Sequence, residues 1–251
     1  MCEYIDTFQR VEHKYLLTQE QQKELLKRIQ SHLVDDKYPT YTLYNIYYDS
    51  TDSIMIMRSL MSPIYKEKLR LRSYGEVKED TPAYLEIKKK FDGIVYKRRI
   101  AMEYETARNY LEREGENPDA SQIAKEIDYV KQFYQVEPKV FIAYDRRAYA
   151  GKLEEDVRIT FDTNIRYRME DLSLHETGQE EKMLEEGQVL MEIKAMDRYP
   201  LWLSEALTEL HLTRTSFSKY GVIYTRLQQK AKQTYTHVLP IKEVQPCLAQ
   251  F

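Results

Sequence analysis

The sequence predicts an α+β fold, an eight-stranded and mostly antiparallel β-barrel with flanking helices. Three observations lead to this prediction. Eight segments alternate with the period of a strand, and most of them are charged on one face and apolar on the other. Few connections between these segments contain a crossover helix, so neighbouring strands should run antiparallel. A closed barrel would place the charged faces around a lumen and the apolar faces under helices.

The expected elements follow from local patterning. Thr18 is predicted to cap the first helix, with Gln21 as its capping-box partner. The expected strands cover residues 8–17, 41–49, 66–74, 84–91, 94–102, 139–150, 155–167 and 189–196. The expected helices cover residues 19–33, 51–60, 103–135 with a break near 115–118, 202–210, and a last one that begins near 220 and ends near 232. The polar, acidic residues 171–186 are predicted to form a loop.

Composition indicates a globular protein. The 251 residues are 42% apolar and 31% charged, which suits one large domain at 1–232 followed by a C-terminal tail at 233–251. No apolar run is long enough to span a membrane and no signal-peptide core follows Met1, so we expect a cytoplasmic protein. Cys2 and Cys247 are too few and too terminal for a disulfide framework or a zinc site.

The strands at 66–74 and 84–91 carry the strongest charge pattern. Lys68, Arg70 and Arg72 share one face of the first, and Lys88 follows on the second. A solvated sheet would explain either strand alone, but the pattern recurs along the chain. In a barrel, the lumen would hold Arg10, Glu12, Lys14, Lys68, Arg70, Arg72, Glu86, Lys88, Lys97, Arg146, Arg158, Glu192 and Lys194. Because so many cations repel one another without an anion, we expect a multivalent anionic ligand.

Three further observations narrow the class of ligand. The 7 glycines form no Gly-rich phosphate loop, so any phosphate must be held by side chains. The net charge of −3 argues against the basic exterior that is typical of nucleic-acid binding. The 22 tyrosines fall mostly at apolar strand positions, which favours core packing over base stacking.

These blocks resemble a known family. The segments Arg10-x-Glu12-x-Lys14-Tyr15, Lys68-x-Arg70-x-Arg72-x-Tyr74 and Glu86-x-Lys88 are similar to the VTC (vacuolar transporter chaperone) polyphosphate polymerase domain. The resemblance continues, in the family's order and to about residue 225, through Tyr144-x-Arg146, Arg158-Ile-Thr-Phe-Asp162, Glu192-Ile-Lys194 and Phe217-Ser218-Lys219-Tyr220. The family belongs to the triphosphate tunnel metalloenzyme superfamily, whose barrel binds triphosphates in its lumen.

The resemblance implies transfer of the ATP γ-phosphate onto a growing polyphosphate chain, assisted by Mn²⁺ or Mg²⁺. It predicts catalytic roles for Lys88, Arg70, Arg72 and Lys219. Glu192 would be the metal ligand, with Glu12 and Glu86 as helpers, since these cations are commonly held by one or two carboxylates plus phosphates. The predicted substrate-binding residues are Lys14, Arg58, Lys68, Lys97, Arg146, Arg158, Lys194 and Ser218. The expected partners are ATP and inorganic polyphosphate or triphosphate, with no nucleic acid.

Two departures keep alternatives open. Hydrolytic relatives, such as the tripolyphosphatase, thiamine-triphosphatase and class IV adenylyl cyclase types, begin with Glu-x-Glu-x-Lys, whereas Arg10 replaces the first glutamate here. The eukaryotic polymerases carry an SPX domain and membrane helices that this sequence lacks, so vacuolar localisation does not transfer and any membrane-protein partner is unidentified. The alternatives are a triphosphate hydrolase of the same fold and a non-catalytic module that binds polyphosphate or an inositol phosphate.

Plainer interpretations of single residues also remain. Glu192 would then only pair with a lumen arginine, and Lys219 would be a solvated residue at the start of a helix. By strand parity, Lys89 and Arg98 are predicted to be surface charges.

Overall fold

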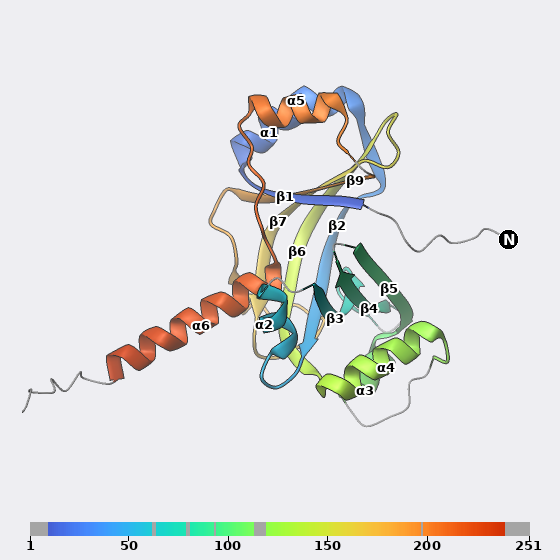
Figure 1. The fold of residues 1–251 in the computed structure, drawn as a ribbon, viewed down its shortest axis with the longest axis vertical. Coiled ribbons are helices and arrows are strands. Elements are labelled where there is room, and N and C mark those ends of the chain that lie inside the picture. Colours follow the sequence, from blue (N-terminus) through green and yellow to red (C-terminus); the bar gives the residue numbers. More distant parts are fainter. Residues whose placement is uncertain are drawn as a thin grey trace, which may run out of the picture.

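A computed structural model describes residues 10–61, 64–78, 81–92, 94–112, 119–196 and 198–238. One antiparallel sheet of nine strands runs through it in the order β1-β9-β7-β6-β2-β3-β4-β5, and β8 pairs with β7 (Figure 1). The strands are β1 (Arg10–Thr18), β2 (Leu33–Asp49), β3 (Tyr65–Tyr74), β4 (Pro82–Phe91), β5 (Ile94–Glu103), β6 (Glu137–Gly151), β7 (Arg158–Arg168), β8 (Glu181–Lys182) and β9 (Gln188–Met196). The helices are α1 (Gln19–Ile29), a 3₁₀ turn (Gln30–His32), α2 (Ile54–Leu60), α3 (Tyr104–Glu112), α4 (Gln122–Tyr134), α5 (Leu201–Glu209) and α6 (Lys219–Val238).

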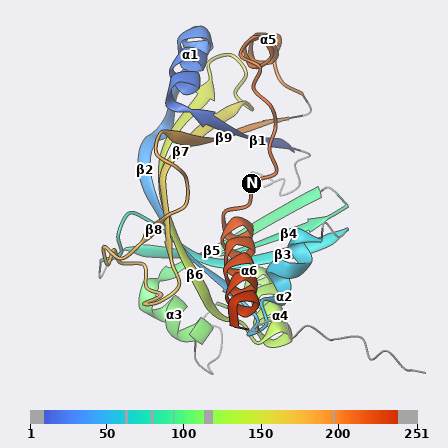
Figure 2. The same cartoon turned by 90° about the vertical axis from the view of Figure 1, so that its left-hand side faces the viewer.

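The prediction of a closed eight-stranded barrel is wrong in closure and in strand count. Among the described residues, β1 and β5 end the sheet without pairing to each other. The free edge of β1 is instead bonded by Thr215, whose backbone N–H donates to the carbonyl oxygen of Lys14 at 2.8 Å. The sheet still curves, so that β1 and β9 lie across from β3 and β4 (Figure 2). Side chains complete the ring, because Glu12 Oε2 lies 3.7 Å from Lys88 Nζ of β4.

Several boundaries differ from the prediction. The first helix ends at Ile29, and Leu33 already begins β2, whose first residues pair with the end of β6. The ninth strand, β8, lies within the segment predicted to be a loop. The last helix continues to Val238 rather than ending near residue 232, since no proline interrupts the sequence before Pro240. The break expected near 115–118 falls outside the described residues.

The convex face of the sheet carries the apolar core under two groups of helices. Leu69 and Leu85 are fully buried there together with Ala107 of α3 and Ile127 of α4. A second cluster joins α1 and α5 to the outer faces of β1, β7 and β9. Burying one Leu or Ile side chain contributes about 1.5–3 kcal/mol. The capping box predicted at Thr18 and Gln21 is present, with Thr18 Oγ1 accepting from the backbone N–H of Gln21.

Two groups of charges on this outer side also differ from expectation. Lys89 and Arg98 are not free surface charges, because both ion-pair with Glu126 of α4, which covers that part of the sheet. The acidic segment 171–186 is anchored by Arg168 of β7. The Nη1 of Arg168 lies 2.6 Å from Glu180 Oε1, and its other nitrogens donate to three backbone carbonyls of the segment. The buried arginine therefore holds the segment as ordered structure.

The concave face is different in character. At one end, Tyr220 and Ile223 of α6 pack with Tyr47 and Tyr144, so the first turns of α6 cover this end of the face. The position of α6 against the sheet is visible in Figure 2. The remainder of this face carries the charged residues of the strands. Of the helices that the structure describes, none combines the length and the apolar character that crossing a bilayer requires.

Candidate anion-binding site

Strand alternation brings the predicted lumen residues to the concave face. The basic side chains that converge there are Lys14 of β1, Lys68, Arg70 and Arg72 of β3, Lys88 of β4, Lys97 of β5, Arg146 of β6, Arg158 of β7, Lys194 of β9 and Lys219 of α6. They outnumber the carboxylates that contact them, which are Glu12, Asp36, Glu86, Asp162 and Glu192. The rest of the chain is acidic enough to make the net charge −3. This face is therefore locally cationic and suited to a polyanion.

Glu86 organises the first cluster, which the structure draws from β3, β4 and β5. Arg70 donates to Glu86 Oε2 from Nε at 2.8 Å and from Nη2 at 2.6 Å. Lys97 Nζ lies 2.9 Å from Oε1, and Arg72 Nη1 lies 3.7 Å from Oε2. Glu86 is only 2% exposed, and although burial raises the pKa of this carboxyl, Arg70, Arg72 and Lys97 outweigh it and hold the pKa well below its usual range. Glu86 thus orients these three cations.

The cations of this cluster keep a fixed geometry. Burial lowers the pKa of Lys97 to about 8, with Arg70 and Arg72 adding to the effect and Glu86 opposing it. Arg72 is buried, and its Nε donates to Asn45 Oδ1 at 2.8 Å. Arginines that are held in this way need little reordering to bind phosphate oxygens with the N–H groups that these contacts leave over.

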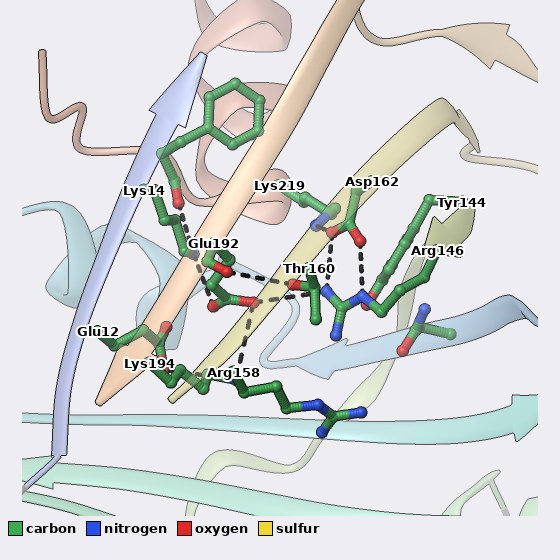
Figure 3. Close-up of polar contacts among 12 residues, drawn as sticks. Glu12, Lys14, Tyr144, Arg146, Arg158, Thr160, Asp162, Glu192, Lys194 and Lys219 are labelled. Atoms are coloured by element: carbon green, nitrogen blue, oxygen red, sulfur yellow. Dashed lines mark hydrogen bonds and ion pairs between the residues drawn. The ribbon is translucent and has the colours of Figure 1, made fainter. Parts of the chain in front are cut away.

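Asp162 organises the second cluster. Arg146 Nε and Nη2 bind its two oxygens at 2.6 and 2.8 Å, and Lys219 Nζ lies 2.6 Å from Oδ2 (Figure 3). Lys219 Nζ also sits 4.0 Å from the centre of the Tyr144 ring. Burial lowers the pKa of Lys219, but Asp162 outweighs burial and raises it, so the ammonium stays charged. Lys219 is not the solvated helix-start residue of the plainer interpretation.

Glu12 of β1 and Glu192 of β9 lie between the Glu86 cluster and the Asp162 cluster. Arg146 Nη2, Lys194 Nζ and Lys14 Nζ lie 3.4, 3.7 and 4.0 Å from the carboxylate of Glu192 (Figure 3). Lys14 Nζ also donates to the carbonyl oxygen of Phe217 at 2.8 Å. Glu12 Oε2 lies 3.7 Å from Lys88 and 3.9 Å from Lys194. Except for the Arg146 contact, these ion pairs are longer than hydrogen bonds, so the two carboxylates are not fully occupied by cations.

A divalent cation fits this pair of carboxylates. Burial raises the pKa of Glu192, but Lys194, Lys14 and Arg146 together hold it well below its usual range, so Glu192 is ionised. No group of three or more His, Cys, Asp or Glu ligands occurs among the described side chains. A metal held by Glu12 and Glu192 would therefore need phosphate oxygens to complete its coordination, which is how Mg²⁺ is commonly bound.

Lys68 and Tyr47 lie at the end of this face that α6 covers. Lys68 Nζ donates to Ser218 Oγ at 2.8 Å, and the same oxygen accepts from the backbone N–H of Gly221. Burial, together with Lys14, Lys88 and Lys66, lowers the pKa of Lys68 to about 8. Burial raises the pKa of Tyr47, but Arg70, Arg72 and Lys68 outweigh it and lower the pKa to about 7. The shift of Tyr47 shows how strongly positive this region is.

Arg58 stands apart from the site, and Arg158 lies on the concave face but is turned away from Glu192 (Figure 3). Arg58 is exposed on α2, and its Nη1 lies 3.5 Å from the hydroxyl of Tyr134 on α4, so the structure does not bring it to the cluster. Arg158 Nε pairs with Asp36 at 2.6 Å, and its guanidinium points away from Glu192 (Figure 3). The remaining predicted residues are brought together as described above. The side chain of Arg10 lies outside the described part of the chain.

The sequence prediction missed the residues that orient the cations. Asp162 was only the last residue of the matched block Arg158-Ile-Thr-Phe-Asp162, and no role followed from that. Tyr144 was part of a matched block but had no partner until the fold placed Lys219 beside it. Asn45 carries no sequence signal at all, because a polar residue in an aromatic strand is informative only once its neighbour Arg72 is known.

Comparisons with known proteins identify a family for the sequence and similar solved structures for the fold. The VTC domain model matches residues 9–227. A solved structure described as a proposed adenylate cyclase from Bacillus halodurans superposes with a TM-score of 0.55 at 11% identity, covering 86% of this chain and 96% of its own. A proposed adenylyl cyclase from Hippeastrum, whose description reports a dominant triphosphatase activity, gives 0.52 at 14% identity, covering 86% and 95%.

These two structures support the fold only, an antiparallel sheet with flanking helices of the triphosphate tunnel type. No curated protein sequence matches the chain. The family model covers most of the chain, from β1 into α6, and includes every residue of the Glu86, Asp162 and Glu192 clusters. The chain therefore belongs to the VTC domain family.

Proposed function

We propose that this protein is a polyphosphate polymerase that transfers the γ-phosphate of ATP to a growing inorganic polyphosphate chain. The observation that carries the proposal is the excess of oriented cations on the concave face of a VTC domain. A terminal oxygen of the chain forms the new P–O bond to the γ-phosphorus. The bond from that phosphorus to the bridging oxygen breaks, and ADP leaves.

The two clusters of cations have different roles in this reaction. Arg70 and Arg72 are held by Glu86 and Asn45, and they bind successive phosphates through the N–H groups that their hydrogen bonds within the fold leave over. Arg146 and Lys219, which are held by Asp162, stabilise negative charge on the transferring phosphoryl group from the opposite side. Such preorganised cations suit phosphoryl transfer, which asks the protein for positioning and charge stabilisation more than for covalent chemistry.

Further positive charge lies between the Glu86 and Asp162 clusters, on Lys14, Lys88 and Lys194. The carboxylates between the clusters, Glu12 and Glu192, are the proposed ligands of Mn²⁺ or Mg²⁺. A bound metal would neutralise charge on the phosphate oxygens that complete its coordination.

The test is incubation of the purified protein with ATP and Mn²⁺, and separately with Mg²⁺, followed by separation of polyphosphate chains by size and measurement of ADP. A ladder of chains with matching ADP release is the expected result. Arg70→Ala should abolish the ladder while the variant remains folded, and Arg28→Ala, a change in an exposed ion pair of α1, should leave it intact. Unchanged chain synthesis by Arg70→Ala would contradict the proposal.

A second candidate is hydrolysis of triphosphates, which the description of the Hippeastrum structure favours. Release of phosphate from tripolyphosphate without chain growth would support the hydrolase and reject the polymerase. Binding of polyphosphate without turnover of ATP or tripolyphosphate would instead leave a polyanion-binding module.

A further inference from the structure

Lysines face each other directly across β3 and β4. In the register of this antiparallel pair, Lys66 lies opposite Lys90, and Lys68 lies opposite Lys88. The next pairs on the same face are different, since Arg70 lies opposite Glu86 and Arg72 opposite Tyr84. Like charges directly opposite one another on a sheet are destabilising. Two successive Lys–Lys pairs on one face therefore need compensation from elsewhere.

The fold supplies little compensation. Among the described residues, no carboxylate lies within ion-pair distance of Lys66, Lys68 or Lys90, and Lys88 reaches only Glu12. Burial and the neighbouring Lys90 lower the pKa of Lys66, and burial lowers the pKa of Lys88. Of the other described cations of the concave face, Arg99 lies over the ring of Tyr84, and the rest are bound to Glu86, Asp162, Glu192, Glu12 or Asp36. Positive charge without a carboxylate partner is thus densest at the end of the site where the two Lys–Lys pairs lie.

The four lysines extend the path of the bound anion. Lys66, Lys68, Arg70 and Arg72 follow one another on the same face of β3, and at about 3.4 Å per residue they span about 20 Å. This length exceeds that of a triphosphate group, and Arg70 and Arg72 already occupy one end of it. Lys66 and Lys90 are half-buried at the other end, beyond the residues that the family resemblance assigns.

We propose that Lys66, Lys68, Lys88 and Lys90 form a subsite for the phosphates of a polyphosphate chain beyond the three that the Glu86 and Asp162 clusters hold. The polyphosphate chain passes first the Lys68–Lys88 pair and then the Lys66–Lys90 pair, where it leaves the site. The inference rests on the proposed function, because it assumes that the concave face binds phosphate chains. It adds the direction in which the chain lies.

The test compares the affinities of two probes, sodium tripolyphosphate and long-chain inorganic polyphosphate, by calorimetry on the full chain without ATP or metal. The wild type should bind the long chain more tightly. The double variant Lys66→Ala/Lys90→Ala should lose about thirtyfold in affinity for the long chain, about 2 kcal/mol for two half-exposed ion pairs, and less than about twofold for tripolyphosphate. Lys125→Ala/Lys152→Ala removes two exposed lysines elsewhere and is the matched control.

Each outcome decides the matter. A variant that keeps the wild-type preference for the long chain overturns the subsite alone and leaves the proposed function intact. A wild type that binds neither probe overturns both. The charge-preserving variant Lys66→Arg/Lys90→Arg should retain the preference, and its loss would also overturn the subsite. As a second readout, Lys66→Met/Lys90→Met should melt at a higher temperature than the wild type without anion, because it removes the like-charge pair, and a lower melting temperature would contradict the repulsion.

Discussion

Replacing Glu86 by glutamine tests whether the cations of the site are organised by this one buried carboxylate. The substitution keeps the shape of the side chain and removes its charge. Arg70 then loses the charged acceptor of two hydrogen bonds, and Lys97 and Arg72 lose their counter-ion. Because Glu86 is 2% exposed and Arg70 is mostly buried, water replaces little of this stabilisation. Removing one partner of such a buried pair destabilises a protein by about 3–5 kcal/mol.

For a chain of this size, 1 kcal/mol shifts the melting temperature by about 2–4 °C. Glu86→Gln should therefore melt about 6–12 °C below the wild type at the lower end of that range. Glu209→Gln is the matched control, since it removes a glutamate from an exposed pair with Arg28 and should change the free energy of unfolding by about 0.5 kcal/mol or less. Differential scanning fluorimetry or calorimetry measures both.

Adding tripolyphosphate gives a second measurement, because this anion can replace the negative charge that Glu86→Gln removes. At a hundred times its Kd, a ligand stabilises the native state by about 2.7 kcal/mol. The rise in melting temperature on adding tripolyphosphate should be larger for Glu86→Gln than for the wild type. A variant that melts within about 1 °C of the wild type, and responds equally to the anion, would refute the view that Glu86 balances these cations.

Three further predictions follow from the structure. Asp162→Asn and Lys219→Met should each lower kcat for chain synthesis about a hundredfold, and the double variant should be no slower than either, because the two residues act as a unit; additive losses would contradict this. Without an anion, the free energy of unfolding at low salt should rise from about pH 8 to about pH 9.5. Lys68 titrates at about 8 in the fold but near 10.5 when unfolded, so the unfolded chain binds more protons in this window. Tripolyphosphate should abolish the rise, and a fall across the window without anion would contradict it. Glu180→Gln should speed proteolysis within 171–186, since Arg168 loses its buried partner, and an unchanged cleavage pattern would show that the backbone contacts suffice.

Much of the site was predictable because strand parity is a local property. Two-residue alternation alone places Lys68, Arg70 and Arg72 on one face, and the excess of cations on several strands already implies an anionic ligand. The capping box at Thr18 is likewise encoded in four consecutive residues. Predictions of this kind succeed because they need no knowledge of distant neighbours.

Parity predicts which face a side chain shares, but not what covers that face. Lys89 and Arg98 were assigned to the surface, and only the packing of α4 shows that Glu126 binds them. Arg58 was predicted to bind substrate like the arginines of the lumen, yet its position on α2 places its side chain beside Tyr134. A helix can be predicted from its own sequence, whereas the charges beneath it depend on where it docks.

The sequence by itself determined the α+β class, most strands, and the cationic face that the VTC family resemblance explains. Only the tertiary structure decided that the sheet stays open, since the edge of β1 is bonded by Thr215 and the ring is completed through Glu12 and Lys88. It alone also decided which cations are neutralised, by Glu86 and Asp162, and which have no carboxylate partner among the described residues, as at Lys66 and Lys90. The physical reason is that alternation along a strand is local, whereas ion pairing depends on register and curvature that join residues far apart in the chain.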